Sequence, residues 1–233
     1  MATFKHFILT RWNLLLDGQS VYTNSPDPDG WMRHRAELFE RITLPSIKAQ
    51  RLKNFTWLLA FDRQTPKEYY LKYLKHPYIE VIYDYPKTYM NNLFKERKIK
   101  NGDWLITTRL DNDDFLEPDF VFQVQRQFND YRKIVDTDGV QWDLESNKFY
   151  TVERRFNNSP FLSLIERAGD MTPLLSGVRP EEPIKTCFYC SHTKMIDHFP
   201  SMKIDKKLYR MVIHDRNISN RIVGKEIIYK DSK

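Results

Sequence analysis

Glycine is scarce in this chain, with 7 among 233 residues. Neither a G-x-G-x-x-G nor a G-x-x-x-x-G-K-[ST] pattern is present. In dinucleotide-binding Rossmann enzymes and P-loop NTPases these glycine-rich turns let the backbone approach the phosphates closely. The sequence therefore argues against both classes of nucleotide-binding protein.

The sequence also lacks long apolar runs and the several cysteine pairs of a disulfide-rich protein. No uninterrupted apolar run approaches the roughly 18 residues of a membrane span, and the opening segment 1–6 lacks a signal-peptide core. We therefore expect a cytoplasmic protein. The two cysteines, Cys187 and Cys190, form a single C-x-x-C, and because a structural zinc needs two further ligands we expect free thiols.

The overall composition, with 41% hydrophobic and 29% charged residues, is typical of a soluble globular protein. A chain of 233 residues suits one domain with a large core. The formal net charge of +6 favours anionic partners. Nucleotide phosphates, anionic lipid headgroups and nucleic acid all fit, so charge alone does not choose among them.

Apolar periodicity predicts strands that alternate with helices through the first half of the chain. The expected strands are 4–10, 54–62, 78–83 and 104–110, and the expected helices are 31–51, 66–75 and 89–100, with Pro45 breaking or kinking the first. This order predicts an α/β fold with a doubly wound, mainly parallel sheet. Beyond residue 114 we expect a β-rich half: a helix over 118–131, a hairpin over 134–150 that turns at 136–139, a long polar insert over 153–183 with a short helix at 160–166, and strands near 185–192 and 209–214.

The mostly apolar run from Trp104 to Leu110 is followed directly by four polar residues, Asp111-Asn112-Asp113-Asp114. In open α/β sheets ligands gather at the carboxyl ends of the strands. If the extended backbone continues, Asp111 and Asp113 share one face while Asn112 points away. Two such carboxylates suit Mg²⁺ or Mn²⁺.

The acidic segment has two other possible structural interpretations. Asp and Glu are favoured at helix N-termini, so the cluster could be a solvated loop that caps the helix near Pro118. A calcium loop of the EF-hand type is excluded by spacing, because Leu116 and Phe122 occupy the sixth and twelfth positions where Gly and Glu are needed. The capping alternative stays open.

Asp111-Asn112-Asp113 resembles the DxD motif of GT-A fold glycosyltransferases. Together with further blocks of sequence, it resembles the rhamnosyltransferase family in particular. The blocks are 10–14, 44–50, 54–62, 107–114 and 212–220, and the resemblance is thinnest between 130 and 185. It implies a single GT-A-like domain over 1–233, with a nucleotide-sugar-binding half at 1–114 and an acceptor-binding half at 115–233.

The resemblance also implies which residues form the site. Asp111, Asp113 and His214 correspond to the ligands of a Mn²⁺ or Mg²⁺ ion. Thr10, Arg11 and Asp62 fall where the family meets the nucleotide, with Arg109 or Arg11 adding a cation. Each has a structural alternative: a strand exit for Thr10 and Arg11, a helix or turn cap for Asp62, and a core histidine for His214.

The implied reaction is metal-dependent transfer of a sugar, L-rhamnose by the family name, from a nucleoside diphosphate to a glycan or lipid-linked acceptor. Inverting transfer requires a carboxylate that accepts the proton of the acceptor hydroxyl. Asp197, Asp205 and Glu166 are candidates for this base, and the sequence ranks none of them. It gives no sign of the stereochemistry.

The composition also suits two functions of other classes. One is a non-catalytic module that binds nucleotide-sugar. The other is a basic protein that binds single-stranded nucleic acid, but here the cations are spread along the chain and interrupted by acidic runs, so we expect no nucleic-acid partner. The basic balance also suits peripheral docking on an anionic membrane near a lipid-linked acceptor.

Overall fold

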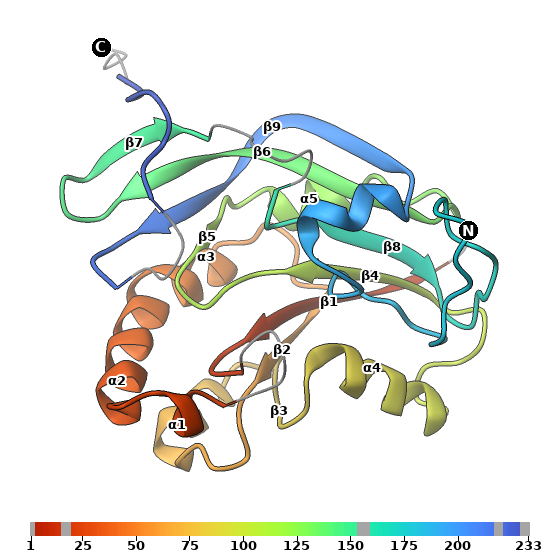
Figure 1. The fold of residues 1–233 in the computed structure, drawn as a ribbon, viewed down its shortest axis with the longest axis horizontal. Helices are drawn as coiled ribbons and strands as arrows, with labels where there is room; N and C mark the ends of the chain where they lie inside the picture. Colours follow the sequence, from red (N-terminus) through yellow and green to blue (C-terminus); the bar gives the residue numbers. More distant parts are fainter. Residues whose placement is uncertain (1–2, 15–19, 153–158, 217–220, 229–233) are drawn as a thin grey trace.

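The computed structural model describes residues 3–14, 20–152, 159–216 and 221–228 (Figure 1). Its centre is a nine-stranded sheet in the order β3-β2-β1-β4-β8-β6-β9-β5, with β7 added at β6. The strands are β1 Phe4–Arg11, β2 Thr56–Ala60, β3 Ile79–Ile82, β4 Trp104–Arg109, β5 Phe115–Leu116, β6 Lys133–Asp143, β7 Lys148–Thr151, β8 Ser163–Arg167 and β9 Ser201–Ile213.

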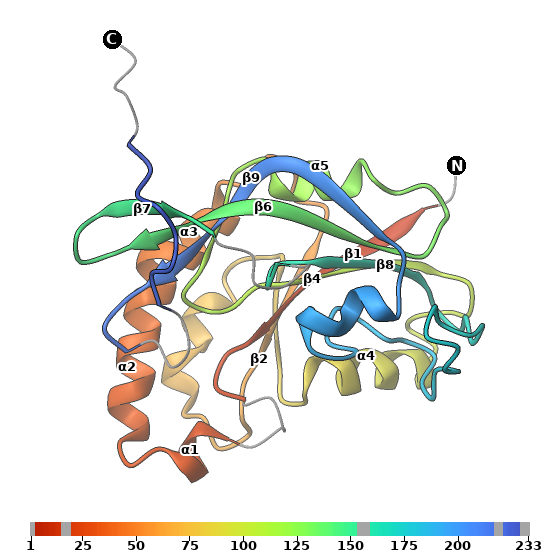
Figure 2. The same cartoon turned by 45° about the horizontal axis from the view of Figure 1, so that its top comes forward.

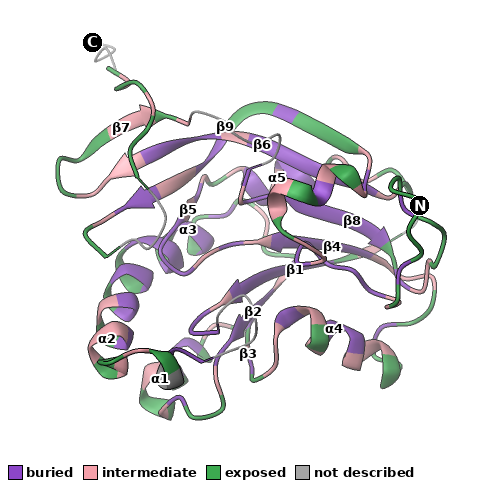
Figure 3. Ribbon diagram, viewed as in Figure 1, coloured by how far each residue is buried: buried purple, intermediate pink, exposed green. Residues whose placement is uncertain are grey.

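The first four strands along the chain, β1 to β4, pair with one another in parallel. β1 lies in the middle, with Phe7 in register with Thr56 of β2 on one side and Phe4 with Trp104 of β4 on the other. β3 continues the sheet from β2 in the same direction. The central residues of β1, β2 and β4 are buried (Figure 3), as expected for parallel strands covered on both faces.

Helices cover both faces of this sheet. Phe39 and Val121 pack with Ile8 on one face, and Met90 and Met195 pack with Leu9 on the other. The predicted doubly wound α/β architecture is thereby confirmed. The helical segments are α1 Val21–Asn24, α2 Pro28–Leu38, π-helical η1 Phe39–Thr43, α3 Leu44–Lys48, 3₁₀ turns η2 Lys67–Tyr69 and η3 Leu71–Tyr73, α4 Pro86–Lys95, α5 Phe120–Gln125 and 3₁₀ helix η4 His192–Asp197.

Pro45 lies inside a helical segment that continues past it. The N–H of Leu44 donates to the carbonyl of Phe39, five residues back, so the chain makes a π-turn before the proline. Proline has no N–H and clashes with the preceding helical turn, and a single wide turn is a known way to absorb an irregularity in a helix. Pro45 was expected to break or kink the helix, and it does not end the helical segment, which continues as the succession α2, η1, α3.

Segment 136–139, predicted to be a hairpin turn, runs inside strand β6. The pairing of β6 with β9 shifts register at Thr137/Asp138 and Asp138/Gly139, so the Asp-Gly signal marks a bulge. A side chain at Gly139 would lie 2.3 Å from Cε2 of Tyr209, which explains why glycine is needed there. The hairpin turn lies later, between Asp143 and Lys148.

Three other predicted elements differ in the structure. The short helix expected at 160–166 is strand β8, antiparallel to β4, with Leu164 in the core of one sheet face and Ile165 in that of the other. The strand expected at 185–192 consists of turns and bends. The helix expected at 66–75 is two 3₁₀ turns. Residues 153–158 of the long insert lie outside the described part.

The second half of the chain is β-rich, as predicted. β6 and β9 pair in parallel over most of their length, and Figure 2 shows these two long strands curving side by side within the sheet, on the side away from β3. The carboxyl end of β9 lies beside α2 in both views. Among the described residues, the helices are too short or too polar to cross a bilayer.

Candidate active site

Polar side chains follow several strands at one edge of the sheet. β1 ends at Arg11, β2 ends two residues before Asp62, β4 ends two residues before Asp111, and β9 ends directly before His214. The N–H of Trp12 donates to the carbonyl of Ala60 at 2.8 Å, so the segments that leave β1 and β2 stay together. This is the carboxyl edge at which α/β sheets bind ligands.

The acidic segment after β4 is a turn held to its neighbours. The strand ends at Arg109 and a turn occupies Asn112 and Asp113, so the strand alternation expected for the carboxylates does not extend to them. Asn112 donates from Nδ2 to the carbonyl of Trp12 at 2.8 Å, and Asp114 accepts the N–H of Val212 at 2.8 Å. These bonds connect the turn to β1 and β9.

Asp113 lies in a buried ion pair. Arg35, from α2, donates to Oδ2 of Asp113, and Nε2 of His214 lies 3.1 Å from the same oxygen. The side chains of Arg35, Asp113 and His214 are 11%, 8% and 4% exposed. The structure therefore brings together Asp113 and His214, two of the three predicted metal ligands, and adds an arginine to them.

Asp111 points to a different partner. Arg109 donates from Nη2 to Oδ2 at 2.8 Å and from Nε to Oδ1 at 3.4 Å, a two-pronged pair. Burial raises the pKa of Asp111, but the positive charges of Arg109 and Arg11 outweigh it, so the pKa lies below its ordinary value. Asp111 therefore stays ionised between two arginines.

Arg11 and Arg109 flank an aromatic ring at this edge. Their guanidinium carbons lie 5.4 and 5.7 Å from the ring centre of Phe188. Nη1 of Arg109 is 3.3 Å from Nδ1 of His192, and burial, followed by the charge of Arg109, lowers the pKa of His192 to about 4. The imidazole is thus neutral near pH 7, and the positive charge belongs to the arginines.

Nε of Arg11 is buried and has no hydrogen-bond partner among the described residues. Burial lowers the pKa of this guanidinium, with Asp111 opposing the shift. A buried donor without a partner costs about 1–3 kcal/mol. The corner formed by Arg11, Arg109 and Phe188 therefore suits a small anion.

Thr10 and Asp62, the other predicted nucleotide contacts, make local structural bonds. Thr10 is fully buried and accepts a hydrogen bond from Nε1 of Trp57 at 2.9 Å. Asp62 accepts the N–H of Gln64 at 2.7 Å, and its own N–H donates to Asn13. Asp62 lies at the carboxyl edge, whereas the hydroxyl of Thr10 lies in the core beneath it.

The three candidate bases lie in different parts of the molecule. Glu166 is fully buried and pairs in register with Leu105. The extended backbone between Leu105 and Asp111 is about 20 Å long, so Glu166 lies far from the carboxyl edge. Its carboxylate accepts the N–H groups of Lys185 and Thr186 at 3.0 and 2.8 Å. Asp205 is exposed in the middle of β9. Asp197 is exposed at the end of η4, the helix that begins at His192.

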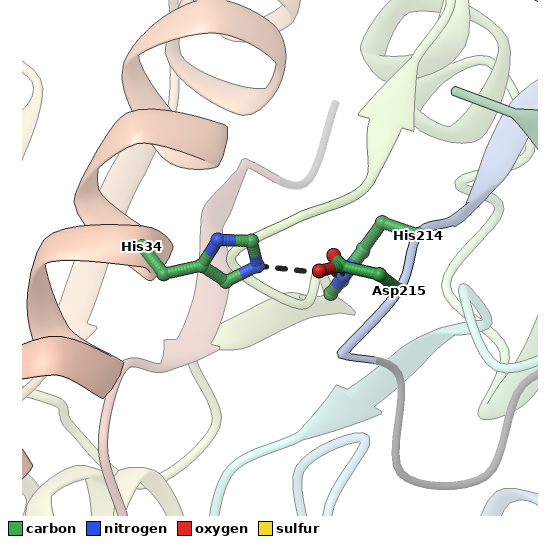
Figure 4. Close-up of side chains that lie close together, drawn as sticks. All are labelled: His34, His214 and Asp215. Carbon is green, nitrogen blue, oxygen red and sulfur yellow. Dashed lines mark hydrogen bonds and ion pairs between the residues drawn. The ribbon is translucent and has the colours of Figure 1, made fainter. Parts of the chain in front are cut away.

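Two residues of α2 belong to this site although the sequence did not point to them. Arg35, in the helix expected over 31–51, is buried against Asp113. His34 faces His214, and the ligand atoms of His34, His214 and Asp215 all lie within 4.8 Å of one another (Figure 4). No local pattern could reveal these contacts, since His34 and His214 are 180 residues apart.

A known protein family matches most of this chain. A profile of the family described as "Putative rhamnosyl transferase" matches residues 26–226. The part of that match at 217–220, which carried some of the sequence resemblance, lies outside the described residues. No curated protein matches the chain.

Solved structures of similar shape include S. aureus TarS 1–349. The structure in complex with UDP-GlcNAc has a TM-score of 0.49 and 12% identity, and the match covers 94% of this chain and 62% of that one. A second TarS 1–349 structure also has a TM-score of 0.49 and 12% identity, with 90% and 60% covered. The present chain thus spans less than two thirds of these TarS chains.

Proposed function

Because this chain belongs to the rhamnosyl transferase family, we propose that it is a glycosyltransferase that moves a sugar, L-rhamnose, from a nucleoside diphosphate to a glycan or lipid-linked acceptor. The observation that carries the proposal is the local excess of positive charge in the corner beside Phe188, where Arg11 and Arg109 share the single carboxylate of Asp111. Residues 1–114 would bind the donor and residues 115–233 the acceptor.

The arginines suit the leaving group of this reaction. As the bond to the sugar breaks, negative charge develops on the departing diphosphate, and fixed cations in a partly buried site stabilise that charge. The unpartnered Nε of Arg11 would donate to a phosphate oxygen. Phe188, packed against both guanidiniums, would hold them in place.

A divalent cation, Mn²⁺ or Mg²⁺, would be held by Asp113 and His214. Their facing atoms are 3.1 Å apart, close to the roughly 3 Å that separates neighbouring ligands of an octahedral ion with bonds of about 2.1 Å. Asp111 would be the third ligand, in exchange for its bond with Arg109. When bound, such an ion stabilises negative charge on the diphosphate.

For the base of an inverting transfer we favour Asp197. The segment that carries it begins at His192, in contact with Arg109. Glu166 is committed to two backbone N–H groups and Asp205 lies away from the carboxyl edge. Asp197→Asn should slow transfer and leave donor binding unchanged.

The proposal is tested by thermal unfolding with a panel of nucleoside diphosphates and nucleotide-sugars, each with Mn²⁺, Mg²⁺ or EDTA. A ligand that binds only the native state must raise the melting temperature. We expect one nucleotide to do so, and Arg11→Gln to weaken its binding at least tenfold. Arg126→Gln is the matched control, because Arg126 is an exposed arginine directly after α5.

Transfer is then measured with the nucleotide-sugar that binds. A protein that binds the donor but releases no sugar to water or any acceptor would favour the non-catalytic alternative. Equal donor binding by wild type and Arg11→Gln would contradict the role given to the arginine corner.

A further inference from the structure

We infer that His34, His214 and Asp215 form a site for a transition-metal cation such as Zn²⁺. This site shares His214 with the Mn²⁺ or Mg²⁺ site proposed above and differs from it in the other two ligands. His34 comes from α2, and His214 and Asp215 follow β9 (Figure 4). The inference does not depend on the proposed sugar transfer. It needs only that these three side chains meet.

The distances suit a tetrahedral ion. Nε2 of His34 lies 3.5 Å from Nδ1 of His214, and Nδ1 of His214 lies 3.8 Å from Oδ1 of Asp215. Ligand atoms about 2.1 Å from a tetrahedral metal are roughly 3.4 Å apart, whereas an octahedral ion at this bond length requires about 3.0 Å. Small side-chain rotations would therefore complete the site.

The chemistry of the donors points to the same class of ion. Two imidazole nitrogens and one carboxylate oxygen suit zinc, nickel or cobalt, while magnesium prefers an all-oxygen set. Three protein ligands leave one tetrahedral position for water or another group. That position would face a cavity of about 360 Å³, which Glu37 and Glu145 also line.

His214 is already oriented for this role. Its Nε2 faces Oδ2 of Asp113 at 3.1 Å, and its Nδ1 accepts the N–H of Arg216 at 3.2 Å. A proton on Nε2 and a lone pair on Nδ1 satisfy both contacts. Histidine ligands commonly donate their other N–H to a carboxylate in this way, which fixes the ring and strengthens the metal bond. The metal would replace the bond from Arg216.

The site would connect two distant parts of the chain. α2 belongs to the half that we assign to the donor, and the end of β9 to the half that we assign to the acceptor. An ion on Nδ1 keeps the proton on Nε2, so it would exclude Mn²⁺ or Mg²⁺ from Nε2 of the same ring. Zinc should therefore compete with Mn²⁺ while using a ligand, His34, that the Mn²⁺ site lacks.

The inference is tested by titrating the untagged, chelator-treated protein with Co²⁺ and Zn²⁺. We expect one Co²⁺ per chain with the strong visible absorption of a tetrahedral complex, and displacement of it by Zn²⁺. His34→Ala should weaken binding at least tenfold and abolish the tetrahedral spectrum. His198→Ala is the matched control, because His198 contacts Ser176 and lies outside the site.

Two further measurements make the outcome unambiguous. The far-ultraviolet circular dichroism of His34→Ala in EDTA must equal that of wild type, and His34→Gln provides a second variant if it does not. Equal Co²⁺ binding by the His34 and His198 variants, or no Co²⁺ binding by wild type, would overturn the inference. Neither result would affect sugar transfer with Mn²⁺, so this failure is distinguishable from failure of the proposed function.

Discussion

Replacing Arg35 with methionine removes one half of the buried ion pair with Asp113 and keeps a side chain of similar length. Arg35 and Asp113 are 11% and 8% exposed, so water cannot compensate the carboxylate that remains. Breaking a buried pair by removing one partner costs about 3–5 kcal/mol. Because His214 still contacts Asp113, we expect the lower end, about 3 kcal/mol of unfolding free energy.

The double-mutant cycle separates the pair from its surroundings. Asp113→Asn alone should also cost about 3 kcal/mol, because it leaves the Arg35 guanidinium buried without its charge partner. The double variant should cost little more than either single one, which gives a coupling energy of about 2–3 kcal/mol. For a chain of this size, 3 kcal/mol corresponds to a lower melting temperature by roughly 6–12 °C.

The assay is urea unfolding followed by tryptophan fluorescence, in EDTA so that no bound cation replaces Arg35. Arg33→Met is the matched control on the same helix, since Arg33 is exposed and such surface changes stay within about 0.5 kcal/mol. The buried-pair reasoning would be refuted if the loss of unfolding free energy in the double variant equalled the sum of the losses in Arg35→Met and Asp113→Asn to within about 0.5 kcal/mol. Mn²⁺ should restore part of the stability of Arg35→Met if Asp113 is a metal ligand.

Two further predictions concern the frame around the site. Burial raises the pKa of Glu166, although the N–H groups of Lys185 and Thr186 oppose the shift. Because the folded state then holds the proton more tightly than the unfolded chain, the free energy of unfolding should fall as the pH rises from about 4.3. In urea unfolding measured at several pH values, Glu166→Gln should lack this part of the pH dependence. A Glu166→Gln variant with the wild-type slope would contradict this source of pH dependence. Gly139→Ala should lower the free energy of unfolding by about 1–3 kcal/mol, because the added carbon would lie 2.3 Å from the Tyr209 ring. An unchanged melting temperature would contradict this prediction and show that the ring can move away without cost.

Much of the parallel half was predictable from local sequence. The segments that became β1, β2, β3 and β4 are short apolar runs between polar turns, and their alternation with helices specifies parallel order. The acidic turn after β4 was found for the same reason, because a buried strand that ends in carboxylates is visible without knowledge of its neighbours. The resemblance to the rhamnosyltransferase family is confirmed by the family profile, which matches residues 26–226.

The second half was less predictable because its strands are specified by distant partners. Segment 163–167 is short and apolar, a pattern that suits a helix or a buried strand equally, and pairing with β4 makes it β8. The Asp-Gly pair at 138–139 is a common turn signal, but pairing with β9 and the close approach of Tyr209 place it inside a strand.

The sequence by itself determined the α/β order, the carboxyl-edge position of Asp111 and Asp113, and the family. Only the tertiary structure decided which polar side chains from distant segments meet: Asp113 with Arg35, and His214 with His34. The physical reason is the range of the interactions. Hydrophobic periodicity acts within a segment, whereas an ion pair or a cluster of metal-binding side chains depends on the packing of α2 and the end of β9, far apart along the chain.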